Sequence, residues 1–333
     1  MKKYAIAYAA NDSLPLFTEN DLHKLTHINL AFGSIKGGRV DVDGLTNIGL
    51  IEQFRGWNPE IKIVLSVGGG GADGFSHMAR MQLGRESFAR SCAEIAERLG
   101  LDGIDIDWEY PCTDRAGICV DPREKEYFTL LLQALRDKLG SRSLSIAAGA
   151  GEYFIQNTEM DKVSQLVDYV QIMTYDMRGG FTHRSGHHAA LRASQNDNSG
   201  LNTVDMVSLF HRSGVPTERL VIGAAFYSRQ WTEVKNQNNG LLQPAESVGE
   251  YGPAYSEITP DFIRQGGYQK LWDEDAQAAY LWNGETFISY ESPEAVALKC
   301  RYAKEAGLAG VMYWEHGCDR THELLGVIGR EFA

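Results

Sequence analysis

Eight short apolar runs recur along the 333-residue chain, and each is followed by a stretch with a helical pattern of apolar residues. The runs are mostly continuous rather than strictly alternating, which is typical of parallel strands covered by helices. Their sequences and positions are YAIAY (4–8), HINLAF (27–32), KIVLSV (62–67), GIDIDW (103–108), LSIAAG (144–149), YVQIMTY (169–175), LVIGAAF (220–226) and GVMYW (310–314). Eight strand–helix units predict an α/β fold of the (β/α)8, or TIM-barrel, class.

Three of the intervening stretches carry helix boundary signals. Residues 85–100 and 121–140 each end at a glycine, a common helix stop, and Pro122 stands near the start of the second stretch. Residues 292–307 repeat this pattern. These stretches are expected to be helices that cover the barrel.

One interval between strands is too long for a single crossover helix. The seventh and eighth runs are separated by residues 227–309, of which the helix before the last strand needs only 293–306. Residues 231–289 are rich in Trp, Tyr and Gly, and about 60 residues of this composition rarely stay disordered. We expect a small inserted α+β subdomain there, with the barrel formed by residues 1–230 and 290–333.

Charge and hydropathy exclude some classes of partner. The net charge is 32 − 44 = −12, and the sequence has no basic stripe, so a nucleic-acid partner is not expected. No apolar run reaches the roughly 18 residues of a membrane span. The start, MKKYAIAYAAND, is better interpreted as a first barrel strand than as a signal peptide. The location therefore stays open between the cytoplasm and a secreted mature chain, and we expect a monomer.

The five cysteines, Cys92, Cys112, Cys119, Cys300 and Cys318, are odd in number and form no CxxC pair. A zinc site on cysteines is therefore not expected, and the sequence indicates no metal and no cofactor. Cys112 and Cys119 flank one loop, where a bridge is conceivable. Five reduced thiols are the favoured alternative for a chain without a clear export signal.

The segment LDGIDIDWEYP (101–111) places acids inside an apolar strand pattern. Asp105, Asp107 and Glu109 fall at alternate positions, so all three point to one face, the barrel interior. Their apolar neighbours point to the helices: Ile104, Ile106 and Trp108. Asp102 has the opposite parity, and we interpret it as structural. Glu109 comes at the carboxyl end of strand four, where barrel enzymes place their chemistry.

Three carboxylates in a partly dry interior cannot all ionise cheaply, because like charge and desolvation both raise their pKa values. A proton shared by Asp105 and Asp107 would relieve the repulsion, and Glu109 would stay protonated as a general acid. A divalent cation is an alternative, but no second acidic cluster offers more oxygen ligands. A purely structural role for the three acids is the least favoured interpretation, because unpaired buried charge is costly.

The same segment resembles the DxxDxDxE signature of glycoside hydrolase family 18, the chitinases, with Asp102, Asp105, Asp107 and Glu109 in its acidic positions. Five further segments resemble motifs of that family in the expected order: SVGGG (66–70), QIMTYDM (171–177), GHHAAL (186–191), FYSRQW (226–231) and VMYWEHGCD (311–319). The resemblance covers nearly the whole chain. The insertion after strand seven is similar to the extra α+β domain of the deep-cleft subgroup.

The resemblance implies a retaining, substrate-assisted hydrolysis of β-1,4-linked N-acetylglucosamine chains. Glu109 would protonate the glycosidic oxygen and later activate water, and the substrate's own 2-acetamido group would be the nucleophile. Asp107 would orient that group, Asp105 would hold or share the proton of Asp107, and Tyr175 would bind the acetamido oxygen. The resemblance also assigns eight substrate-binding or supporting positions: Tyr8, Phe32, Ser66, Met173, Asp176, Tyr227, Arg229 and Trp314.

Two departures from the family pattern bear on the substrate. Many chitinases carry Trp directly after SxGG, where this chain has Gly70, and Ser228 replaces the usual Gly of the strand-seven motif. No carbohydrate-binding module follows the barrel in this sequence. Soluble chitin chains or N-acetylglucosamine oligomers are therefore the expected partners, rather than crystalline chitin.

Two rival functions remain. A lectin-like member of the family would keep the barrel and lose the acid, but Glu109 is present. A hydrolase of the chitobiose core of glycoproteins, of peptidoglycan or of spore cortex is the second rival. The insertion, which deepens a cleft suited to linear oligomers, favours chitin.

Overall fold

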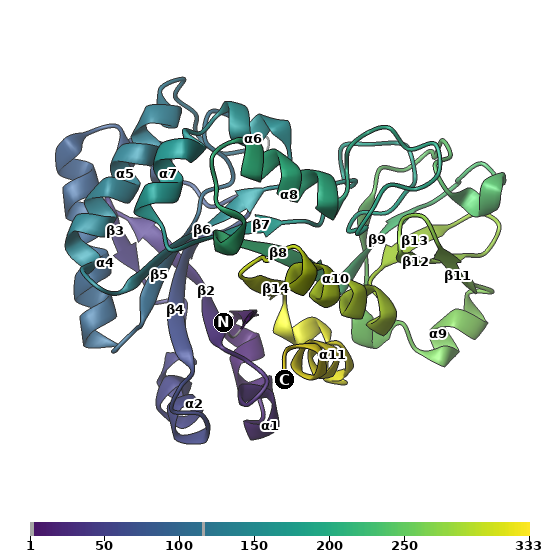
Figure 1. Cartoon of the computed structure of the whole chain (residues 1–333), viewed down its shortest axis with the longest axis horizontal. Helices are drawn as coiled ribbons and strands as arrows, with labels where there is room; N and C mark the ends of the chain where they lie inside the picture. Colours follow the sequence, from purple (N-terminus) through teal and green to yellow (C-terminus); the bar gives the residue numbers. More distant parts are fainter. Residues whose placement is uncertain (1–2, 115–116) are drawn as a thin grey trace.

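A closed parallel barrel forms the centre of the computed structural model, which describes residues 3–114 and 117–333 (Figure 1). Within this part, each of the eight apolar runs is a strand of the barrel. The strands are β1 (Tyr4–Ala10), β2 (His27–Lys36), β4 (Lys62–Gly68), β5 (Gly103–Asp107), β6 (Ser143–Gly149), β7 (Tyr169–Met173), β8 (Leu220–Ala225) and β14 (Gly310–Trp314). Pairing of β1 with both β14 and β2 closes the barrel, so the predicted TIM barrel is confirmed. Met1 and Lys2, which open the signal-like segment, lie outside the described residues.

Helices cover the outside of the barrel. They are α1 (Glu19–Leu22), α2 (Ile51–Trp57), α3 (Phe75–Ala79), α4 (Gln82–Arg98), α5 (Glu124–Leu139), α6 (Glu152–Gln156), α7 (Met160–Leu166), α8 (Thr203–Arg212), α10 (Pro293–Glu305) and α11 (Glu323–Phe332). The three helices predicted from sequence correspond to α4, α5 and α10. Pro122 lies in the turn before α5, which begins at Glu124. The Glu124 carboxylate holds this turn, because it accepts hydrogen bonds from the backbone N–H groups of Asp121 and Cys112. Among the described helices, none has both the length and the apolar character needed to cross a membrane.

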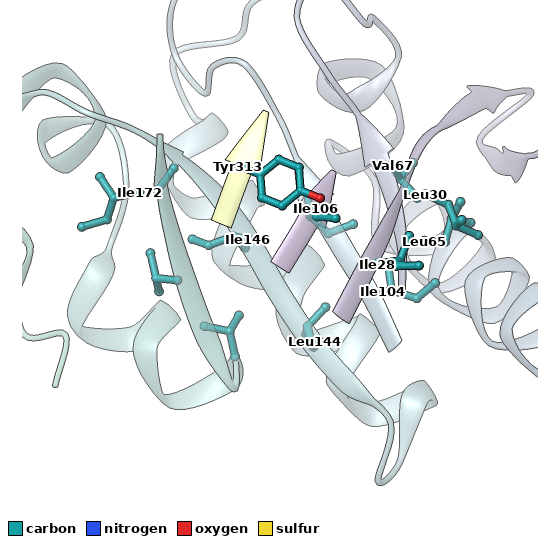
Figure 2. Close-up of a cluster of buried hydrophobic side chains, with 14 of the residues drawn as sticks. Ile28, Leu30, Leu65, Val67, Ile104, Ile106, Leu144, Ile146, Ile172 and Tyr313 are labelled. Atoms are coloured by element: carbon teal, nitrogen blue, oxygen red, sulfur yellow. The ribbon is translucent and has the colours of Figure 1, made fainter. Parts of the chain in front are cut away.

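The main hydrophobic core lies between the barrel and these helices. Figure 2 shows the aliphatic side chains of neighbouring strands in this layer, including Ile104 and Ile106 of β5. Trp108 belongs to the same layer and stacks on Phe75 of α3. The outward face of β5 is thus apolar, as its alternation predicts, and its acids are left to the interior.

A second, antiparallel sheet stands beside the barrel (Figure 1). Its order is β10 (Glu250–Ala254), β9 (Tyr227–Trp231), β13 (Phe287–Tyr290), β12 (Ala278–Trp282) and β11 (Gln269–Asp273), and α9 (Pro260–Gln265) packs nearby. The sheet spans residues 227–290, slightly more than the predicted 231–289. Only Phe226 separates β8 from β9, so barrel strand and second sheet are nearly continuous. We retain the division into a barrel and an inserted subdomain as a proposal.

The five cysteines are free thiols in the structure. The Cys112 Sγ lies 3.8 Å from the backbone oxygen of Pro122, and Cys119 is hydrogen-bonded to Asp73 instead. The bridge between Cys112 and Cys119 is therefore absent from this arrangement of the described residues.

Candidate active site

The deepest acid of the barrel, Asp105, is surrounded by hydrogen-bond donors. The sheet register places Ser66 of β4 and Ser145 of β6 beside it. The hydroxyls of Ser66 and Ser145 donate to the Asp105 carboxylate over 2.6 and 2.7 Å. The Tyr8 hydroxyl donates to it over 2.8 Å, and the side-chain amide of Gln171 over 2.9 Å. Burial raises the pKa of Asp105, and these four hydrogen bonds counteract part of that rise.

Asp107 lies one layer nearer the mouth of the barrel and lacks such support. It is 3% exposed, and among the described residues its Oδ1 has no hydrogen-bond partner. Burial, the charge of Glu109 and the charge of Asp105 together raise the pKa of Asp107 well above its ordinary value. Each oxygen of Asp105 already accepts from two donors. The sharing of a proton between Asp105 and Asp107 stays a prediction.

Glu109 follows β5 at the barrel mouth. Burial raises its pKa, the charge of Asp176 adds to the rise, and a hydrogen bond with Tyr110 opposes it. A side-chain carbon placed on Gly70 would lie 3.7 Å from Glu109 Oε1. The position where many chitinases carry Trp therefore adjoins the acid directly. Asp105, Asp107 and Glu109 form one ascending series, called the acid row below.

A cavity of ≈ 280 Å³ opens above the acid row. Nine of the residues named from sequence line it: Tyr8, Phe32, Asp107, Glu109, Met173, Tyr175, Asp176, Tyr227 and Trp314. The Phe32 ring stacks on Trp314 with centroids 5.3 Å apart, and Tyr175 meets Tyr227 edge to face. An aromatic floor beside buried carboxyls suits a sugar ring, whose apolar face stacks on π-systems and whose hydroxyls need polar partners.

Asp176 is held differently from the acid row. The guanidinium of Arg229, on β9, donates to both Asp176 oxygens over 2.7 Å, and the buried ring of His188 lies 3.4 Å away. Burial alone would raise the pKa of Asp176, but these hydrogen bonds outweigh it and hold the pKa well below its usual range. Asp176 thus brings a fixed negative charge to the cavity wall.

A second cavity of ≈ 520 Å³ adjoins the first. The two share Tyr110, Met173, Tyr175 and Asp176, and the second adds Arg229 and residues of the loop after β7. That loop presents Phe181, which is 67% exposed. The two cavities therefore lie side by side and have part of one wall in common.

Two of the residues assigned to substrate binding or to support of the acids do not line the first cavity. Ser66 contacts Asp105 rather than the first cavity, and Arg229 contacts Asp176 and lines only the second cavity. Asp102 points away from the interior, as its parity predicts, and pairs with Arg55 and Lys62.

Four residues of the site were not anticipated from the sequence. Ser145 and Gln171 bind Asp105, and each is a polar residue at an inward position of an apolar run, a signal that was available. Tyr110 and Tyr251 line the cavity. Tyr251 lies opposite Arg229 in the β9–β10 pairing, and its ring centroid is 3.7 Å from the guanidinium carbon.

A parallel barrel with an inward acid row at the carboxyl end of one strand, below an aromatic cavity, defines the class of barrel glycoside hydrolases. The model of the family "Glycosyl hydrolases family 18" matches residues 4–319. The chain belongs to this family. The deep-cleft subgroup stays a prediction.

Similar proteins extend over the whole chain or most of it. The structure of a family 18 N-acetylglucosaminidase from Paenibacillus barengoltzii is 45% identical, with a TM-score of 0.96 and 99% of each chain covered. Chitinase ChiW from Paenibacillus sp. str. FPU-7 is 33% identical, with a TM-score of 0.94, over 99% of this chain and 43% of that one. Chitinase A1 from Niallia circulans is 33% identical over 84% of this chain. The chain spans only 43% of that relative's length.

Proposed function

We propose that this chain hydrolyses β-1,4-linked N-acetylglucosamine chains with retention of configuration, using the substrate's 2-acetamido group as nucleophile. The observation that carries the proposal is the contrast within the acid row. A supported Asp105 lies beneath an unsupported Asp107, and Glu109 follows at the cavity. Family 18 uses substrate-assisted chemistry, which needs one acid and one orienting carboxylate rather than a protein nucleophile.

Glu109 is the general acid. Its raised pKa keeps a proton on the carboxyl closer to neutral pH than an exposed glutamate would. The proton passes to the glycosidic oxygen as the bond to the anomeric carbon breaks. The resulting carboxylate then takes a proton from the water that opens the intermediate, so Glu109 serves as acid and base in turn.

Asp107 and Tyr175 position the acetamido group. Both line the cavity, so the Asp107 carboxyl can accept from the acetamido N–H of a bound substrate. As the acetamido oxygen attacks the anomeric carbon, positive charge develops on the ring that forms, and a neighbouring carboxylate stabilises that charge. The Tyr175 hydroxyl, whose pKa burial raises well above its ordinary value, stays protonated and can donate to the acetamido oxygen.

The aromatic floor and the adjoining cavity support a chain rather than an isolated sugar. Trp314 and Phe32 offer ring faces to a sugar at the point of cleavage. The second cavity continues past Asp176 to the exposed Phe181, where a further sugar unit would stack. Soluble oligomers of N-acetylglucosamine are therefore the proposed substrates.

A second candidate is the release of single N-acetylglucosamine units from chain ends. The 45% identical relative is named an N-acetylglucosaminidase, and Gly70 leaves no aromatic platform beside Glu109. The first cavity, ≈ 280 Å³, is also at the small end of ligand sites. This candidate uses the same acid row and differs in where along the chain the cut falls.

Product analysis from chitohexaose distinguishes the two candidates. Chitinase action yields dimers and longer fragments early in the reaction, and end-acting release yields the monomer from the first turnover. Parallel assays with fluorogenic glycosides of N-acetylglucosamine and of chitobiose give the same information as rates. If neither glycoside nor any oligomer is cleaved between acidic and neutral pH, the lectin-like alternative replaces the enzyme proposal.

A further inference from the structure

Two histidines and an aspartate from three separate segments meet on the outside of the barrel, behind β14. They are Asp21 of α1, His316 of the short helix η6 (His316–Cys318) and His322, the residue before α11. One donor atom from each lies within 4.8 Å of the other two. None of the three lines either cavity of the candidate active site, so the proposed hydrolysis leaves this cluster without a role.

The imidazole of His316 is held in one orientation. Its ring stacks on Phe17 with centroids 3.6 Å apart, and its Nδ1 lies 3.1 Å from the Tyr313 hydroxyl. Its Nε2 is buried and makes no hydrogen bond of normal geometry among the described residues, although His316 is only 2% exposed and its ring lies near the backbone of Leu16. A buried, unpartnered ring nitrogen is costly unless a ligand satisfies it.

The remaining two donors are also arranged around this point. The Asp21 Oδ2 atom accepts hydrogen bonds from the backbone and hydroxyl of Thr18, which fix its carboxylate, and it lies 2.9 Å from His322 Nδ1. His322 is the least buried of the three, with 29% of its side chain exposed. Two of the three residues are therefore buried, and the third, His322, is partly exposed although its Nδ1 atom is buried.

We propose that Asp21, His316 and His322 bind one divalent transition-metal ion, with zinc as the best match. Imidazole nitrogen and carboxylate oxygen are the ligand types that zinc takes, and a water molecule on the solvent side would complete four-coordination. Ligand atoms on a tetrahedral zinc lie roughly 3.3 Å apart, so small side-chain rotations bring the three donors to one ion.

Charge around the cluster has two opposing parts. The Asp21, Glu315 and Asp319 carboxylates all act on Tyr313, which places three negative charges near the site. Lys24 contributes one positive charge, with Nζ 3.3 Å from Asp21 Oδ1, and it would compete with a metal ion. An ion pair of Asp21 with protonated His322 and Lys24, with no metal, is the rival arrangement.

Such an ion would join three segments that are distant in sequence. Asp21 lies in the first crossover, His316 follows β14, and His322 directly precedes α11. The link would hold the end of β14 two residues beyond Trp314, the sugar-stacking residue of the proposed site. The metal is thus structural and separate from the acid row.

Titration of the metal-stripped full chain with Zn²⁺, followed by calorimetry and by Tm, tests the proposal. We expect one zinc per chain and a Tm that rises with zinc concentration, because an ion that binds only the folded state stabilises it. Co²⁺ in place of zinc should give the visible absorption of a four-coordinate nitrogen and oxygen site. A chain that binds no zinc, or binds it without a change in Tm, overturns the proposal.

Matched variants locate the ion. His322 has φ 56°, a conformation that asparagine tolerates, so His322→Asn removes the imidazole with little backbone cost. This variant should lose zinc binding, whereas His77→Asn, an exposed histidine elsewhere, should bind as the parent does. Tyr313→Phe should weaken zinc roughly 10–100-fold, since it removes the partner that orients His316. Lys24→Gln should tighten binding. Unchanged zinc affinity in His322→Asn would refute the assignment.

Discussion

Asp105 and Asp107 lie two residues apart on one strand, face the same barrel interior and are almost equally buried, yet their surroundings differ completely. Asp105 accepts four side-chain hydrogen bonds, and Asp107 has an oxygen with no partner among the described residues. Burial alone therefore does not determine what a carboxyl does. The number of donors decides whether the interior stabilises its charge or leaves it reactive.

Asp176 extends the comparison to a third outcome. Like the acid row it is near the cavity, but Arg229 forms a two-point ion pair with it, and the pKa of Asp176 falls well below its usual range. The site thus holds three carboxyls in three environments: Asp105 accepts hydrogen bonds, Asp107 has an oxygen without a partner among the described residues, and Asp176 is paired with a cation. The proposed mechanism needs this difference, because a proton donor and a charge stabiliser cannot share one environment.

The largest expected effect on activity comes from removing the proton donor Glu109, at the outer end of the acid row. Glu109→Gln should lower turnover of chitobiose or N-acetylglucosamine glycosides roughly 10²–10⁴-fold, because the substitution removes the transferable proton. Oligomer affinity, measured by calorimetry, should change little. Glu60→Gln, at an exposed position, is the control and should keep full activity. Substantial residual turnover in Glu109→Gln would assign the acid elsewhere.

The second test sets the two aspartates against each other. Asp105→Asn should destabilise the fold by about 1–3 kcal/mol, because an amide cannot accept from all four donors. Asp107→Asn should instead raise Tm by about 2 °C or more near neutral pH, because it removes a poorly supported charge, and should still lose most activity. Thermal unfolding of both variants gives the comparison. Equal losses of stability would show that donor number does not distinguish the two positions.

The pH dependence of the Asp107→Asn variant sharpens the same contrast. The unfolded chain ionises Asp107 near pH 3.9, and the folded chain only at higher pH, since its pKa is raised. Wild-type stability should therefore fall relative to the variant as pH rises through that interval. The difference in Tm should vanish below about pH 4 and grow toward neutral pH. A difference that stays constant from pH 3.5 to pH 8 would contradict the raised pKa.

The smallest expected effect concerns the supported carboxylate Asp176. Tyr251→Ala removes the ring that lies over Arg229, an interaction worth about 0.5–1 kcal/mol at an exposed site. Substrate KM should rise roughly 2–5-fold with little change in kcat. Tyr251→Phe, which keeps the ring, is the matched control. A loss of kcat in the alanine variant would place Tyr251 in the chemistry rather than in the cavity wall.

The sequence was informative where a local pattern determines the structure. Continuous apolar runs predicted the barrel strands, and alternation within residues 101–111 predicted which side chains of β5 face inward. Both depend only on neighbours along the chain and on the pleat of a strand. The inward direction of the acid row was therefore predictable from the sequence, whereas the pKa shifts of its individual carboxyls were not.

The unpredicted residues depend on pairing between distant segments. Ser145 and Gln171 reach Asp105 only because of the parallel register of four strands. Tyr251 reaches Arg229 only because β10 pairs with β9 in one register, which no local pattern specifies. The asymmetry between Asp105 and Asp107 has the same origin, since the donors come from other strands.

The ion pair between Asp176 and Arg229 limits how this protein could be shortened. Asp176 belongs to the segment after β7, and its guanidinium partner is supplied by β9, the strand that begins the second sheet. Cutting out residues 227–290 to obtain a minimal barrel would leave a carboxylate at the cavity without its cation, at a cost of about 3–5 kcal/mol. A reduced scaffold would need a replacement cation from the barrel itself, or a neutral residue at position 176.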